Sequence, residues 1–167
     1  MNKPERDEMI EEYGRGFETF KAALAEIPRQ AWEFNPEAGE WSVHQLILHM
    51  ADAETIGATR ARKLIAEPGA TLMVYDDNAW AKALRYQEQD VDDALQLLNL
   101  VRKTTYAILK QMPEQVFAQT LVHPEHSYPE YGEAYTLEKW LRIYTRHVRD
   151  HVAQLRQIHQ AWQLRNK

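Results

Sequence analysis

Apolar residues recur every three or four positions along four long stretches of the chain, and this spacing predicts four amphipathic helices. Segments that contain proline and glycine separate the stretches and favour connections over continued helix. The expected helices span residues 4–27, 43–66, 90–112 and 136–163, the connections span 28–41, 67–89 and 113–135, and a short helix is expected near 77–85. No stretch of the sequence shows the alternation of a β-strand. The pattern predicts an all-α protein, a four-helix bundle with long connections, folded as one domain over residues 1–167.

Capping residues mark where three of these helices begin. Ser42, with Gln45 three residues later, fits a capping box at the start of the second helix. Asp90 and Thr136 are of the residue types that cap helices, and they precede the third and fourth long helices. The third long helix shows no ionisable residue on its expected inner face, so we expect it to be purely structural.

Two histidines lie four residues apart in the last predicted helix. His147 and His151 fall within the apolar stripe that includes Tyr144, Val148 and Val152, so both rings are expected to face the core. An unpaired buried polar group costs roughly 1–3 kcal/mol, and each imidazole therefore needs a partner. A shared metal ion would satisfy both rings, because histidines four apart on a helix form a known zinc-binding geometry. Hydrogen-bonded core histidines are the alternative.

The second predicted helix carries two histidines on different sides. His49 lies in the apolar stripe, whereas His44 lies about 140° away on the helical wheel and is expected to be exposed. Asp52, one turn after His49, is either a carboxylate that orients the imidazole or a solvated surface group. His123 and His126 lie on either side of a proline in a polar connection, and we expect them to face solvent.

The three inward histidines, His49, His147 and His151, come from two different helices. Helical bundles build metal sites in this way, from side chains on facing helices. Three neutral imidazoles suit a divalent metal such as zinc, nickel or iron(II). Three protein ligands also leave one coordination position open, which is typical of a catalytic metal site.

The connection over 67–89 combines aromatic and acidic residues, among them Tyr75, Asp76, Asp77 and Trp80. Long connections of this composition more often cover a site than merely link two helices. Together with Asp52, the residues Tyr75, Asp76 and Asp77 are therefore candidates for orienting a substrate or transferring a proton.

Composition and charge narrow the classes of function. The chain carries 20 Lys and Arg against 25 Asp and Glu, a net charge of −5, which disfavours binding to nucleic acid. It has no cysteine, which excludes disulfides, thiolate ligands and a cysteine nucleophile. The charged start has no apolar signal segment, and no apolar run reaches the roughly 18–20 residues of a membrane span. We therefore expect a soluble, cytoplasmic protein without a membrane partner.

Four short motifs distributed along the chain occur together in one protein family. They are Trp41-Ser42, His49-Met-Ala-Asp52, Tyr75-Asp-Asp with Trp80, and His147-x-x-x-His151. On these motifs the chain resembles, over most of its length, the DinB-like (damage-inducible) superfamily of metalloproteins. The resemblance implies a four-helix bundle, a divalent metal held by the three histidines, and a homodimer.

The resemblance also implies activity on a small molecule. Members of the superfamily include metal-dependent hydrolases and transferases that join low-molecular-weight thiols, such as bacillithiol or mycothiol, to electrophiles. Because the chain has no cysteine, any such thiol has to be a co-substrate from outside. Three hypotheses stay open at this point: a metal-dependent enzyme, a non-catalytic metal-binding module for stress response or interaction, and a structural bundle with hydrogen-bonded histidines.

Overall fold

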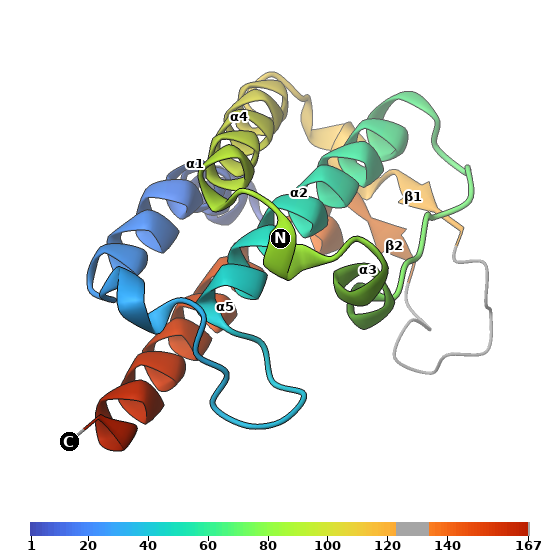
Figure 1. Ribbon diagram of the computed structural model, residues 1–167. Helices are drawn as coiled ribbons and strands as arrows, with labels where there is room; N and C mark the ends of the chain where they lie inside the picture. The colour runs from blue at the N-terminus through green and yellow to red at the C-terminus, as the bar shows by residue number, and fades with distance from the viewer. Residues whose placement is uncertain (123–133, 167) are drawn as a thin grey trace.

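The computed structural model describes residues 1–122 and 134–166 and consists mainly of helices (Figure 1). The α-helices are α1 Lys3–Ala25, α2 Val43–Ala66, α3 Asp77–Ala83, α4 Val91–Leu109 and α5 Leu137–Arg165. Short 3-10 segments lie between them, at η1 Arg29–Ala31, η2 Tyr86–Glu88 and η3 Glu114–Ala118. The four long helices confirm the expected all-α bundle, and α3 is the short helix expected near 77–85.

The predicted capping residues begin the helices as expected. Ser42 accepts a hydrogen bond from the Gln45 backbone, and the Gln45 side chain bonds back to the Ser42 N–H. Asp90 caps α4 and Thr136 caps α5 in the same way, with their side-chain oxygens. Each such cap contributes about 0.5–2 kcal/mol, because it satisfies amide groups that have no partner within the helix.

The long helices pack around one shared interior. Helices α1 and α2 each contact both α4 and α5, and Figure 1 shows α5 passing behind α2 and extending to the C-terminus at the lower left. The interior contains two apolar clusters, one around Phe20 and Leu155 and the other around Leu137 and Trp140. Burying a large apolar side chain of this kind contributes roughly 1.5–3 kcal/mol, so the two clusters hold the helix pairs together.

A minimal sheet fastens the start of α5, although the sequence pattern predicted no strand. Strand β1, Thr120–Leu121, pairs antiparallel with β2, Tyr135–Thr136, and Thr71 forms an isolated parallel bridge with Val122. The expectation of no strand is therefore wrong for these residues. Strands of two residues are too short to show an alternating pattern, so only the fold reveals them.

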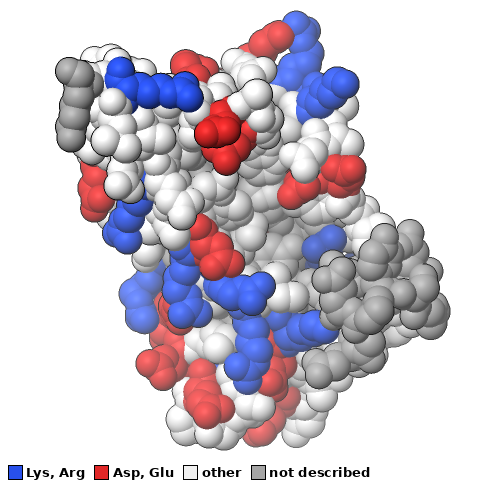
Figure 2. Space-filling model, turned by 90° about the horizontal axis from the view of Figure 1, so that it is seen from below, with Lys and Arg blue, Asp and Glu red and all other residues white. Residues whose placement is uncertain are grey.

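The surface mixes charges of both signs. Figure 2 shows acidic and basic side chains interspersed over the face seen from below. Within residues 1–122 and 134–166, no helix is both long enough and apolar enough to cross a membrane. His123 and His126, which we expected to face solvent, lie outside the residues that the structure describes.

A buried ion pair connects all four long helices. Glu54 of α2 and Arg102 of α4 are each 1% exposed, and the Glu54 carboxylate contacts both the Arg102 guanidinium and the Tyr13 hydroxyl of α1. Arg102 also donates to the backbone oxygens of Tyr13, at 2.9 Å, and of Tyr144 on α5, at 3.3 Å. The expectation that the inner face of this helix carries no ionisable residue is wrong, because Arg102 points inward to meet a buried acid.

Helices α2 and α5 approach closely at Gly57. A Cβ atom at this position would lie 2.2 Å from the Cε1 atom of the Tyr144 ring, which is far inside van der Waals contact. The indole of Trp140 donates a hydrogen bond to the Gly57 carbonyl at 2.8 Å. The absence of a side chain at Gly57 therefore sets the spacing of α2 and α5 about one turn before His147.

We predict that Glu54→Gln lowers the free energy of unfolding by about 3–5 kcal/mol, because it leaves the Arg102 guanidinium buried without a counter-charge. Urea denaturation measures this change. Glu67→Gln is the matched control and should have little effect, since the Glu67 carboxylate pairs with Lys63 on the surface. The double variant Glu54→Leu/Arg102→Met should lose less stability than the sum of the losses in Glu54→Leu and Arg102→Met measured separately. Strictly additive losses would contradict the role of the pair.

We predict that Gly57→Ala lowers the free energy of unfolding by about 1–3 kcal/mol, because the new methyl group overlaps the Tyr144 ring. Alanine otherwise favours a helix over glycine by about 1 kcal/mol, so a destabilised variant identifies the clash as the stronger effect. Thermal denaturation compares this variant with Thr59→Ala, a control at an exposed position of the same helix. An unchanged or raised melting temperature for Gly57→Ala would show that the close approach is not needed.

Candidate metal centre

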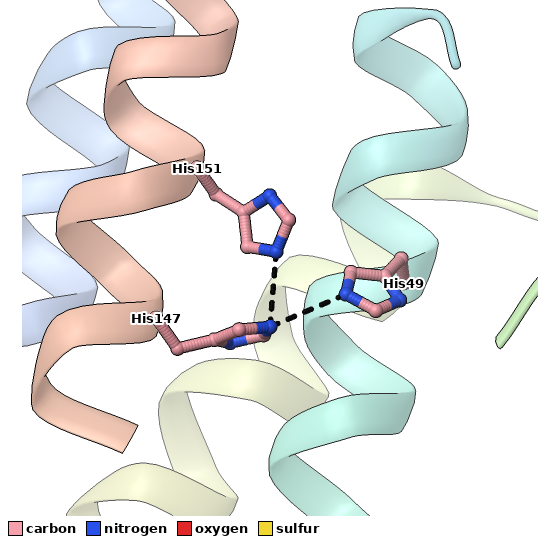
Figure 3. Close-up of side chains that lie close together, drawn as sticks. All are labelled: His49, His147 and His151. Atoms are coloured by element: carbon pink, nitrogen blue, oxygen red, sulfur yellow. Dashed lines mark hydrogen bonds between the residues drawn. The ribbon is translucent and has the colours of Figure 1, made fainter. Parts of the chain in front are cut away.

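Three histidine side chains converge between α2 and α5 (Figure 3). His49 projects from α2, and His147 and His151 project from successive turns of α5. The Nε2 atom of His147 lies 3.3 Å from Nε2 of His49 and 2.9 Å from Nε2 of His151. Each residue offers one ligand atom, and these atoms all lie within 4.8 Å of one another. The three histidines expected to face inward are therefore brought together by the fold.

The spacing of these nitrogens fits a shared metal ion. Two nitrogen ligands at about 2.0–2.1 Å from a tetrahedral zinc ion lie roughly 3.3 Å apart, close to the two distances that His147 Nε2 makes to His49 and His151. Hydrogen bonding alone fits less well, because a neutral imidazole nitrogen either donates one hydrogen or accepts through one lone pair. One linear hydrogen bond can satisfy only one of the two short contacts made by His147 Nε2, whereas a cation satisfies all three nitrogens.

The surroundings keep the three imidazoles neutral at pH 7. Burial, with a smaller effect from His151, lowers the pKa of His49 to about 3. Burial also lowers the pKa of His147 well below its usual value, with further contributions from the other two histidines. The pKa of His151 is lowered by burial as well, although its hydrogen bond to Gln154 opposes the shift. Neutral imidazoles present the free lone pairs that metal coordination requires.

Two neighbouring side chains contact the imidazole rings of His151 and His49. His151 Nδ1 lies 2.8 Å from Oε1 of Gln154, and because an amide oxygen only accepts, Nδ1 carries the hydrogen and Nε2 is left free. The Trp41 ring packs on His49, with ring centres 4.5 Å apart. His49 Nδ1 is buried and has no hydrogen-bond partner in the described part of the chain. Packing rather than a hydrogen bond therefore orients His49.

Asp52 takes neither of the two arrangements considered from sequence. It is half-buried, and it accepts a hydrogen bond from the Tyr86 hydroxyl at 2.6 Å instead of bonding the imidazole of His49. Burial, followed by the Asp52 interaction, raises the pKa of Tyr86, so the phenol stays protonated as the donor. The 3-10 segment η2 thus covers this side of α2 and fixes the direction of the Asp52 carboxylate.

The three candidates of the 67–89 connection have different positions. Asp76 caps α3 by accepting from the Ala79 N–H at 2.9 Å. The Tyr75 ring packs against Trp80, with ring centres 4.8 Å apart. Asp77 is half-buried, and its charge acts on His151 by favouring the protonated imidazole. Of the three, Asp77 is electrostatically coupled to the histidine cluster, whereas the side chain of Asp76 has a structural role.

The exposure of His44 differs from the one expected from the helical wheel. It was expected to be exposed, but its side chain is only 12% exposed. Its Nδ1 lies 2.7 Å from Glu33, and its Nε2 lies 3.0 Å from the backbone oxygens of both Tyr86 and Gln89. The segment after α3 folds over the first turn of α2, which the position of His44 on a wheel does not show.

Arg60 is a neighbour of the site that sequence reasoning did not single out. Its Nε and one terminal nitrogen donate to the Met73 carbonyl, at 2.9 and 2.6 Å, and the other terminal nitrogen lies 3.2 Å from the Tyr144 hydroxyl. The ring of Tyr144 lies 6.2 Å from that of His147. Arg60 therefore ties the 67–76 connection to α5 close to the histidine cluster. The signal in the sequence was its position on the apolar stripe of the second helix.

Several curated proteins are similar to this chain. "Putative metal-dependent hydrolase YfiT" of Bacillus subtilis is 27% identical over 120 residues, which are 72% of this chain and 65% of that protein, just under two thirds. A relative of the same description from Bacillus licheniformis is 25% identical over 136 residues, 81% of this chain and 74% of the relative. Another from Bacillus cereus is 23% identical over 158 residues, 92% of this chain and 89% of the relative.

A solved structure and a family model match most of this chain. The structure of YfiT from Bacillus subtilis, described as "a probable metal-dependent hydrolase with an unusual four-helix bundle topology", matches with a TM-score of 0.83 at 23% identity. The match covers 95% of this chain and 87% of that chain, and it shows a shared fold. The model of the DinB superfamily matches residues 12–155, a range that includes His49, His147 and His151. The protein therefore belongs to the DinB superfamily.

Proposed function

We propose that this protein binds one divalent metal ion, zinc, nickel or iron(II), through His49, His147 and His151 and acts as a metal-dependent enzyme on a small electrophilic molecule. The observation that carries the proposal is the convergence of three neutral imidazole nitrogens at distances that suit one shared ion. The relatives carry the name "Putative metal-dependent hydrolase", which supports the same class of reaction.

The chemistry is divided between the ion and the residues of the chain. A divalent ion with three protein ligands supplies a Lewis-acid centre with an open position, which lowers the pKa of a nucleophile held there. Asp52, whose carboxylate is oriented by Tyr86, is our candidate for accepting the proton that this nucleophile loses. Asp77, whose charge acts on His151, and Tyr75 beside it in the chain are our candidates for orienting the substrate.

Two nucleophiles fit the open position. Water would make the protein a hydrolase, and a low-molecular-weight thiol would make it a thiol transferase. The thiol has to be a separate co-substrate, because the chain contains no cysteine. A non-catalytic metal-binding module is the second candidate function, and it shares the metal centre but predicts no turnover.

We predict that protein purified without chelators or a histidine tag contains about one divalent metal ion per chain, measured by inductively coupled plasma mass spectrometry. Chelation should remove the ion and reloading should restore it. His49→Ala should weaken metal binding by more than about 100-fold, since loss of a ligand costs more than loss of a residue that supports one. His159→Ala is the matched control, because His159 lies on α5 and bonds Gln163 rather than the cluster. Full metal content in His49→Ala would remove the proposed centre.

We predict that turnover of electrophilic probes falls by about 100-fold or more when the metal is removed. Hydrolysis of p-nitrophenyl acetate tests water as the nucleophile, and conjugation of 1-chloro-2,4-dinitrobenzene in the presence of cysteine tests a thiol. Turnover that needs no thiol supports the hydrolase, and turnover only with the thiol supports the transferase. Equal rates for the metal-loaded and metal-free protein would contradict catalysis and favour the non-catalytic module.

A further inference from the structure

A groove of about 900 Å³ borders the candidate metal centre. Its walls come from the 36–41 connection, from Asn78 at the start of α3 and from the last turns of α5. Two lining residues contact the histidine cluster directly, since Trp41 packs on His49 and Gln154 bonds His151. The groove therefore begins one side chain away from the ligand atoms, and its volume is in the range of small-molecule sites.

The lining of the groove favours hydrogen-bonding, uncharged groups. Three amide side chains line it, those of Asn78, Gln154 and Gln157. An amide can both donate and accept, and Gln154, whose oxygen accepts from His151, keeps its N–H groups for a ligand. Trp41 and Ile158 add apolar surface against which a carbon chain can pack. This combination of a few polar groups with an apolar wall is typical of sites that orient a small molecule.

The charged groups of the lining disfavour an anion. Glu37 and Glu40 are both exposed to the groove, against one guanidinium, that of Arg165. Arg165 is already engaged, because it donates to the Pro36 carbonyl at 2.7 Å and lies over the Phe34 ring at 5.2 Å. An anionic ligand would therefore meet two carboxylates, while the one cation of the lining is held by the connection itself.

A second, smaller hollow adjoins the groove and shares the two carboxylates with it. It adds the cations of Lys82 and Arg85 and the carboxylate of Glu88. Arg85 forms an ion pair with Glu88, so that guanidinium is already matched by a carboxylate. The neighbouring hollow therefore adds one unmatched cation, Lys82, which does not outweigh Glu37 and Glu40.

We propose that this groove binds the non-reacting part of the substrate and selects an uncharged, amide-bearing group over an anionic one. The inference rests on the proposed function, because it places the reacting bond at the histidine centre. Binding energy from such a remote part of a substrate positions the reacting part. Gln154 connects the groove to the histidine cluster, because it lines the groove and also accepts a hydrogen bond from the Nδ1 atom of His151.

Hydroxamates test the proposal with the zinc-loaded protein, because the hydroxamate group chelates the metal and its tail probes the groove. Acetohydroxamate has no tail and reports on the metal centre alone. Three probes with equal six-carbon chains end in a carboxamide, a carboxylate or a methyl-branched alkyl group of the same shape. Isothermal titration calorimetry should show the carboxamide binding about fivefold tighter than the carboxylate and tighter than the alkyl probe.

Two groove variants and one control complete the experiment. Ala161→Trp fills the groove, and it should weaken the carboxamide probe at least about fivefold while leaving acetohydroxamate unchanged. Glu37→Gln/Glu40→Gln should bring the affinities of the carboxylate and carboxamide probes within about twofold of each other. Glu8→Gln/Glu18→Gln removes the same charge from exposed positions of α1 and should leave the difference intact.

The outcomes separate the two proposals. If wild-type protein takes up no zinc, or if the zinc-loaded wild-type protein does not bind acetohydroxamate, the proposed metal centre is overturned. Acetohydroxamate can bind normally while the affinities of the tailed probes depend neither on the end group nor on the groove variants. That result overturns the groove inference and leaves the metal centre standing. A preference for the carboxylate probe also overturns the groove inference, because it reverses the charge selectivity.

Discussion

The architecture depends on the ion pair between Glu54 and Arg102, because this pair is the point where all four long helices meet. Both side chains are removed from water, which is costly for charged groups unless every remaining polar atom is satisfied. The Tyr13 hydroxyl and the backbone oxygens of Tyr13 and Tyr144 complete that set. A wrong register of any one helix would leave a buried charge without a partner, so the pair makes the arrangement of the bundle specific.

The histidine centre depends on this frame. Tyr144, which accepts from Arg102 through its backbone, precedes His147 by one turn of α5. The charge of Arg102 also lowers the pKa of His147, which adds to the effect of burial. The central ion pair thus acts on the site in two ways: it fixes the helix that carries two of the three histidines, and its Arg102 favours the neutral form of His147.

The connections and α5 itself supply the side chains around the three histidines. Trp41 comes from the connection before α2, Tyr86 from the segment after α3, and Gln154 from α5 itself. The helices place the three histidine nitrogens with the precision of a rigid scaffold, whereas the groove beside them is lined jointly by the 36–41 connection, α3 and the last turns of α5.

The sequence by itself determined the number of long helices, their capping residues and which histidines face inward, because helical period and capping act over a few neighbouring residues. The same local rule placed His147 and His151 on one face. It could not show that Arg102 turns inward, that His44 is covered, or that Asp52 bonds a tyrosine 34 positions away. A helical wheel gives the direction of a side chain but not what lies there. Only the tertiary structure decides that, because partners far apart in the chain meet when the helices pack.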